Sequence, residues 1–168
     1  LVEQTNGHFG DTIARQFLFD KYALLRAEHL AQQTFDLDAA SIATKAVKEI
    51  RYHAAHSSKW IIRLGDGTSE SHSRIQKSIN DLWAFTGEMF VADEVDIAGS
   101  IAGLLPDLGA LKTQWDIEID SVLEEATLVR PKDGAMKTGG RMGVHTEALG
   151  TMLAEMQILP RTHPGASW

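Results

Sequence analysis

The sequence of 168 residues predicts an all-α protein, built as a bundle of long antiparallel helices. In each long segment the apolar residues recur at intervals of three and four, as on one face of a helix. No segment alternates convincingly between apolar and polar residues, as a half-buried strand would. The length suits one domain over residues 1–168, which should bury roughly 70% of the surface of its unfolded chain.

The first two predicted helices carry wide apolar faces. The segment 11–32 places Ile13 and Phe17 near one line, with further apolar residues beside them. A second helix is predicted at 38–64, with an apolar stripe centred on Ile50, and the sequence GDGT ends it.

The rest of the chain predicts three further helices. Thr68 is a suitable cap for a third helix, which we expect to continue to about Ala102. Pro106 precedes a fourth helix at 107–129. After a polar loop, a last helix is predicted at 145–159, ended by Pro160. Its residues expected to face inward are Leu149, Met152, Leu153 and Met156.

Composition excludes several classes of protein. The net charge is −7 and Lys and Arg do not cluster, which argues against nucleic-acid binding. There is no cysteine, hence no disulfide and no thiolate nucleophile, as is common in cytosolic proteins. No apolar run approaches the ~18 residues of a membrane span, and no signal peptide is recognisable.

Residues 48–56, KEIRYHAAH, place acidic and imidazole side chains on the second predicted helix. Glu49, His53 and His56 follow one another at about one helical turn, so their side chains point the same way. Bundles that hold two iron ions carry Glu-x-x-His on each of two helices. In this chain Tyr52 stands where the histidine would be, and Glu-x-x-His occurs nowhere in the sequence. The sequence therefore predicts no metal site.

The sequence predicts instead a polar cluster in which a lysine replaces the metal, because buried carboxylates need a cation. We expect Glu49 to be partly buried, paired with Lys45 or another basic group, and hydrogen-bonded to His53 or a neighbouring helix. Alternatively, Lys45 and Glu49 form an exposed pair worth a few tenths of a kcal/mol. With single glutamates of other helices, the vestigial metal-site cluster comprises Glu28, Lys45, Glu49, Tyr52, His53, His56 and Glu88.

Two other features have plainer interpretations. The glycine-rich TGGRMG, residues 138–143, follows no strand and lacks the ending of a phosphate loop, so a flexible turn before a helix is favoured. The four tryptophans and Tyr52 either pack in the interior or serve a protein interface, and Tyr52 lies opposite the apolar stripe of its helix.

Five segments together resemble one known family. In order they are DTIARQFLFDKY, AVKEIRYHAAHSSKWIIRLGDGT, LWAFTGEMF, EATL and GGRMGVHTEALGTMLAEMQILPRTHPGASW. They span essentially the whole chain and are similar to the structural C subunits of bacterial phenylacetyl-CoA epoxidases, multicomponent monooxygenases of aerobic phenylacetate catabolism. Members of this family begin with further helices ahead of LVEQ, so the resemblance implies an N-terminally shortened chain.

The resemblance implies a ferritin-like helical bundle that supports a related catalytic A subunit. In this family the A subunit holds the di-iron centre, and NADPH supplies electrons through a reductase with flavin and iron–sulfur groups. The resemblance therefore implies a cytoplasmic, non-catalytic chain without catalytic residues, metal or other cofactor. Its partners would be the A subunit and the other subunits of the complex, with self-association left open.

The alternative function is a ferritin-like di-iron oxygenase that carries its own metal. Its ligands would include Glu28, Glu49, His53 and Glu88.

Overall fold

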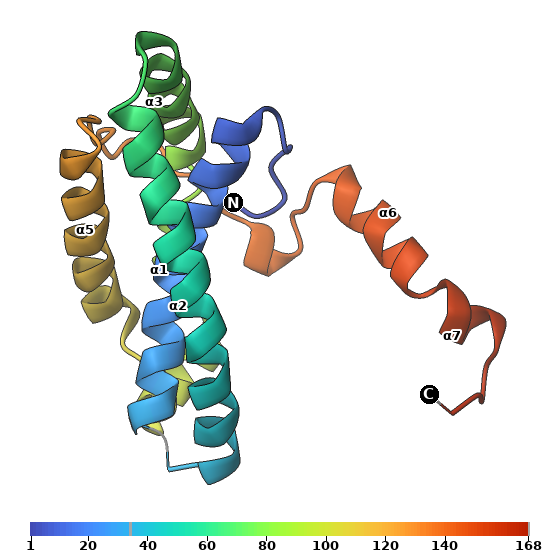
Figure 1. The fold of residues 1–168 in the computed structure, drawn as a ribbon. Helices are drawn as coiled ribbons and strands as arrows, with labels where there is room; N and C mark the ends of the chain where they lie inside the picture. The colour runs from blue at the N-terminus through green and yellow to red at the C-terminus, as the bar shows by residue number, and fades with distance from the viewer. Residues whose placement is uncertain (34, 168) are drawn as a thin grey trace.

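The computed structural model describes residues 1–33 and 35–167, which form helices and no strand. Helices α1 (Phe9–Gln33) and α2 (Leu37–Gly65) make a long antiparallel hairpin. Helices α3 (Ser69–Trp83) and α5 (Leu108–Glu125) pack against this hairpin (Figure 1). The predicted all-α helical bundle is therefore confirmed.

The main core lies where these four helices meet. Trp115 of α5 is fully buried, and its indole Nε1 donates a 3.1 Å hydrogen bond to the carbonyl oxygen of Leu18 in α1. The ring centroids of Trp83 and Phe90 lie 5.7 and 5.3 Å from that of Trp115. A smaller apolar cluster joins the far halves of α1 and α2 through Leu24, Val47 and Ala54. The other fully buried large side chains of the core are Phe17, Leu18, Ile61, Ile75, Ile79, Ile119 and Leu123.

Aspartate or threonine caps the start of several helices, since these side chains accept hydrogen bonds from backbone amides left free in the first turn. Thr68 accepts from the amide of Ser71, which confirms the predicted cap of α3. Helix α4 (Glu94–Ile101) begins with a capping box between Asp93 and Asp96. The remaining caps are Asp36 for α2 and Asp107 for α5.

The predicted third helix, continuing to about Ala102, is wrong. Helix α3 ends at Trp83, and a short 3₁₀ helix η1 (Gly87–Phe90) and α4 follow it. The carbonyl oxygen of Ala84 accepts a 2.7 Å hydrogen bond from the amide of Lys137, a residue far along the chain. The Thr86 hydroxyl donates a 2.8 Å bond to the carbonyl oxygen of Trp83. These contacts take carbonyl groups that a continuing helix would use.

The fourth helix starts as predicted but ends earlier, at Glu125. Thr127 adopts a left-handed backbone with φ of 58°. The amides of Thr127 and Leu128 then bond back to Glu124 and Leu123. Residues 127–146, here called the strap, follow without an α-helix and contain only the 3₁₀ helix η2 (Gly140–Met142).

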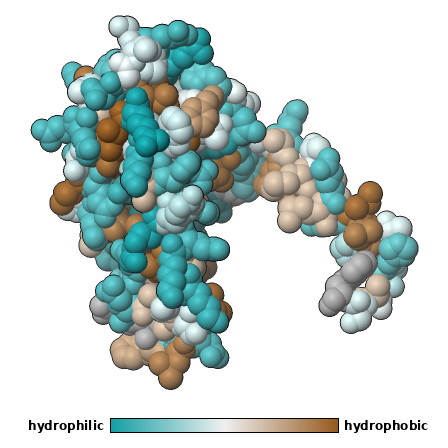
Figure 2. All heavy atoms as spheres, in the orientation of Figure 1, coloured by the Kyte–Doolittle hydropathy of each residue, from teal (hydrophilic) through white to brown (hydrophobic). Residues whose placement is uncertain are grey.

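The predicted last helix is wrong in its packing. It consists of α6 (Glu147–Met156) and α7 (Ile158–Thr162), so Pro160 lies within α7. Both project from the bundle as an arm with exposed hydrophobic residues (Figures 1 and 2). Of the residues predicted to face inward, Leu149 is half-buried and the others are exposed: Met152, Leu153 and Met156.

No helix in the described part of the chain is long and apolar enough to cross a bilayer. The assignment of residues 1–168 to one domain stays a prediction.

We predict that Gly65→Ala lowers the free energy of unfolding by about 1–3 kcal/mol, because overpacking displaces backbone. A Cβ at Gly65 would lie 2.2 Å from the carbonyl oxygen of Ala126, where the ends of α2 and α5 meet. Urea denaturation measures the loss. Gly134→Ala is the control, because a Cβ there meets no atom within 4 Å and should cause no loss. Equal stability of the two variants would contradict this packing.

Candidate functional site

The polar and aromatic residues of KEIRYHAAH lie on the exposed side of α2. Lys45, Glu49, Tyr52, His53 and His56 are all exposed. Among the described residues, no ion pair or side-chain hydrogen bond involves Lys45 or Glu49. The expectation that Glu49 is partly buried, paired with Lys45 and bonded to His53 is therefore wrong.

The expectation failed because it centred the apolar arc of α2 on Ile50. The buried residues of α2 include Val47, Ala54 and Ile61, whereas Ile50 is only half-buried and Ile42 is exposed. At 100° per residue, Ala54 lies about 40° from Ile50 on the side away from His53. The side of α2 that packs against α1 is rotated accordingly, and this rotation turns His53 and Glu49 to solvent.

The two remaining glutamates of the predicted cluster lie apart from it. Glu28 of α1 accepts a 2.7 Å hydrogen bond from Arg51 of α2, an ion pair near the surface. Glu88 in η1 accepts a 2.6 Å bond from the amide of Gly139 in the strap. The structure thus gives Glu28 and Glu88 separate partners.

These side chains do not fit a di-iron centre. Two irons need several carboxylates and histidines that converge from facing helices. Within residues 1–33 and 35–167, no group of three or more His, Asp or Glu side chains is placed to hold a metal ion. The exposed positions of Glu49 and His53 and the tyrosine at position 52 agree with this.

Tyr52 and His56 contribute instead to a row of rings along α2. The ring of Tyr52 stacks on that of His56, with centroids 6.2 Å apart and planes 25° apart. His56 in turn meets the edge of Trp60 at 6.5 Å. Tyr52, predicted to lie opposite the apolar stripe, is 70% exposed.

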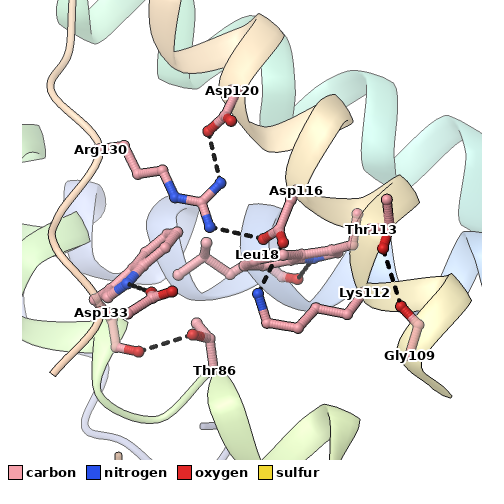
Figure 3. Close-up of polar contacts among 11 residues, drawn as sticks. Leu18, Thr86, Gly109, Lys112, Thr113, Asp116, Asp120, Arg130 and Asp133 are labelled. Atoms are coloured by element: carbon pink, nitrogen blue, oxygen red, sulfur yellow. Dashed lines mark hydrogen bonds and ion pairs between the residues drawn. The ribbon is translucent and has the colours of Figure 1, made fainter. Parts of the chain in front are cut away.

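Ion pairs of Arg130 and Arg141 hold the strap, and sequence analysis did not identify them. Arg130 donates hydrogen bonds of 2.7 Å to Asp116 and to Asp120 of α5 (Figure 3). Its guanidinium also lies 4.9 Å from the ring centroid of Trp83. Burial opposes ionisation of Asp116, but Lys112 and Arg130 outweigh it and lower the pKa of Asp116. The start of the strap is thereby fixed to α3 and α5.

Arg141 fixes the second half of the strap to α4. It forms ion pairs with Asp93 and with the buried carboxylate of Asp96, which also lies 3.6 Å from Arg26 of α1. Burial alone would raise the pKa of Asp96, but hydrogen bonds from Arg141 and the Asp93 backbone lower it overall. TGGRMG thus contains the predicted turn ahead of α6, held to α4 by Arg141, and its flexibility stays a prediction.

The arm begins at a contact with the N-terminal segment. The Glu3 carboxylate accepts bonds from the amide and hydroxyl of Thr146, and lies 2.7 Å from Nδ1 of His145. The hydrogen bond from the backbone amide of Thr146 is the largest cause that lowers the pKa of Glu3, to about 2. A carboxylate at the start of α6 complements the positive end of the helix, and so Glu3 orients the arm.

Asp20 is a buried carboxylate between α1 and α2. Ser57 and Gln16 each donate it a hydrogen bond of 3.1 Å, but burial dominates and raises its pKa. A sequence signal existed, because Asp20 lies one turn from Phe17 on the apolar side of α1 and Ser57 lies in the apolar stripe of α2.

We predict that Arg141→Ala lowers the free energy of unfolding by about 2 kcal/mol at pH 7, because it leaves Asp96 buried with a weaker partner. Since the folded-state pKa of Asp96 is lowered, the contribution of the pair is present above the unfolded pKa. It disappears as the pH falls through the folded pKa.

Chemical denaturation at pH 7 and at about pH 3 measures the difference. Arg74→Ala is the matched control, because its ion pair with Glu70 is exposed. It should cost less than about 0.5 kcal/mol at either pH. A loss in Arg141→Ala that is the same at both pH values would contradict the role of Asp96.

We predict that Asp20→Asn raises the stability at pH 7. The raised pKa means that the folded state disfavours ionised Asp20, so stability is lost as the pH rises through the folded pKa. Asparagine avoids this loss and still offers an oxygen to Gln16 and an amide to Ser57.

Thermal melts from pH 3 to pH 8 test this, with Asp81→Asn on the exposed side of α3 as the control. The gain should vanish below about pH 4, where aspartate is neutral even when unfolded. Lower stability of Asp20→Asn at pH 7 would show that the negative charge is required.

Comparison with known proteins gives two matches. The sequence matches the profile of the family described as "Phenylacetic acid catabolic protein" over residues 1–168. It is also 48% identical over 168 residues to the C subunit of the 1,2-phenylacetyl-CoA epoxidase of Escherichia coli strain K12. This alignment covers 100% of the present chain and 67% of the relative.

Proposed function

The chain belongs to the family of phenylacetic acid catabolic proteins, ferritin-like helical proteins, and we propose that it is the non-catalytic structural subunit of a phenylacetyl-CoA epoxidase. The identity of 48% to the C subunit of such an epoxidase carries this proposal. The geometry of α2 supports the non-catalytic role, because the candidate ligands Glu49 and His53 are exposed and have no converging partners among the described residues.

The partners follow from this proposal. A catalytic A subunit holds the di-iron centre that activates oxygen for attack on the aromatic ring of phenylacetyl-CoA. A reductase with flavin and iron–sulfur groups passes it electrons from NADPH. The present chain binds the A subunit, stabilises it and contributes no redox group, and the complex is cytoplasmic.

We predict that the purified chain contains no stoichiometric iron and forms no epoxide alone. Elemental analysis after aerobic purification, and again after anaerobic incubation with ferrous ion, measures the metal. Turnover of phenylacetyl-CoA is assayed with the A subunit and reductase, in the presence and absence of this chain. The full mixture should be active, and omission of this chain should lower the activity.

The alternative function, an oxygenase with its own iron, predicts the opposite results. About two irons per chain, or epoxidation by this chain and the reductase alone, would overturn the proposed role. Glu49→Ala provides a further comparison. It should leave metal content and melting temperature unchanged, because the side chain is exposed.

A further inference from the structure

An asparagine followed by a glycine lies in the segment ahead of α1. Asn6 and Gly7 are both exposed and belong to no helix, in a loop beside the base of the arm (Figure 1). Among the described residues, the backbone amide of Gly7 donates no hydrogen bond. This amide nitrogen is therefore free to react with the side chain that precedes it.

The fold requires a glycine at position 7. Its φ is 54°, in the left-handed region that residues with a side chain rarely adopt. A Cβ there would also clash with the carboxylate of Asp11, which accepts a 2.9 Å hydrogen bond from the amide of His8. Because residue 7 has no side chain, the side-chain carbon Cγ of Asn6 can approach the Gly7 nitrogen without steric hindrance from it.

Arg15 of α1 places hydrogen-bond donors around Asn6. Its Nη2 donates a 2.7 Å hydrogen bond to Oδ1 of Asn6, and its Nη1 donates to the carbonyl oxygens of Gln4 and Thr5. Arg15 is half-buried and forms no ion pair with a carboxylate in the described part of the chain. Its guanidinium therefore binds a neutral amide, although a carboxylate would form a stronger hydrogen bond.

We propose that Asn6 is a site of deamidation, in which Arg15 stabilises the oxyanion of the reaction. After the amide of Gly7 loses its proton to a solvent base, its nitrogen attacks Cγ of Asn6, and the electron pair of the C=O bond moves onto Oδ1. The side-chain nitrogen takes a proton from solvent and leaves as ammonia, which closes a cyclic imide. Water then adds to either imide carbonyl and breaks its bond to nitrogen, so position 6 becomes aspartate or isoaspartate.

The position of Arg15 favours both the intermediate and the product. Its hydrogen bond already meets Oδ1, the atom on which negative charge develops, and a donor positioned in this way lowers the barrier. Arginine stays ionised throughout the pH range of the reaction. Ring opening then places a carboxylate beside this cation. Isoaspartate also adds a methylene to the main chain between α1 and Glu3, which holds the start of the arm.

Other residues of the chain lack this combination. Asn80 is the second asparagine, and the amide that follows it, that of Asp81, lies within α3, where amides bond to carbonyls four residues earlier. Asp66 and Asp133 precede glycines, but a carboxylate must first be protonated and then lose water, which is slow at neutral pH. Their isomerisation also leaves the mass unchanged, whereas deamidation replaces NH2 by OH. Asn80 thus serves as an internal control.

The test incubates the purified chain at neutral and at mildly alkaline pH and follows both asparagines by peptide mass spectrometry. Asn6 should be converted at least about tenfold faster than Asn80, whose helix must open first. The rate should rise with pH, because the Gly7 amide must lose a proton. A methyltransferase specific for isoaspartate should label position 6, since the imide opens on either side, whereas direct hydrolysis of the side chain gives aspartate alone.

Variants of Arg15 test the oxyanion contact. Arg15→Ala should slow the conversion of Asn6 about fivefold, less than the roughly 100-fold loss on removal of a buried oxyanion donor, because Asn6 is exposed to water. Arg15→Lys should retain part of the rate, since it keeps the charge but not the paired nitrogens.

Arg161→Ala is the matched control. It removes the same charge from an exposed side chain of α7 that lies outside the ion pairs of the described residues. The rate should stay within about twofold of the parent's, because a distant surface charge is screened. Circular dichroism melts of every variant check the fold.

Several results would overturn the proposal. Equal conversion of Asn6 and Asn80 would show that the loop confers no reactivity, and a product without isoaspartate would exclude the imide. If Arg15→Ala melts like the parent and reacts as fast or faster, Arg15 only restrains the loop and the proposal is wrong. If Arg15→Ala melts at a lower temperature, Arg15→Lys decides, and a rate equal to or above the parent's contradicts the proposal.

Discussion

The fold depends on the burial of α1 between α2, α3 and α5. Phe17 and Leu18 of α1 are fully buried, and the carbonyl oxygen of Leu18 also accepts the indole hydrogen of Trp115. Because α1 supplies a surface to three neighbours, α2 needs to bury only one arc of its circumference. The orientation of α2 is therefore set by the helices that pack beneath it, and the polar residues on its other side are exposed in this structure.

The strap is held by ion pairs in addition to apolar burial, since Leu128 and Met136 pack on the main core. Its residues have little regular structure, so their backbone groups and side chains need other partners. Arg130 and Arg141 bind acidic residues of α5 and α4, and Glu3 binds the end of the strap. Hydrogen bonds between ionised groups are stronger than neutral ones and restrict geometry. A chain with excess acidic residues can thereby hold a long connection through very few basic side chains.

Periodicity predicted the helices that pack on the core, and it failed where distant residues decide. The end of α3 depends on Lys137, whose amide takes a carbonyl of Ala84, and no local pattern reveals that contact. The arm has helical periodicity, yet its Met156 is 69% exposed, because amphipathic spacing does not say whether a surface lies beneath it. In the candidate site, Ala54 of the buried arc lies about 40° around α2 from Ile50, and this difference decides which side chains are buried. The apolar pattern did not reveal it, because Ile42 is exposed and Ile50 is only half-buried.

The polar residues of α2 would cost the fold different amounts of free energy in a metal site and on an exposed surface. In a metal site, buried carboxylates and histidines lose their hydration, and coordination of the metal ion offsets that loss. On the exposed side of α2, Glu49, His53 and His56 keep their water, so their presence costs the fold little. Substitutions there are therefore expected to change stability little. The contribution of α2 to stability therefore comes from the side that faces α1, where Val47, Ala54 and Ile61 are buried.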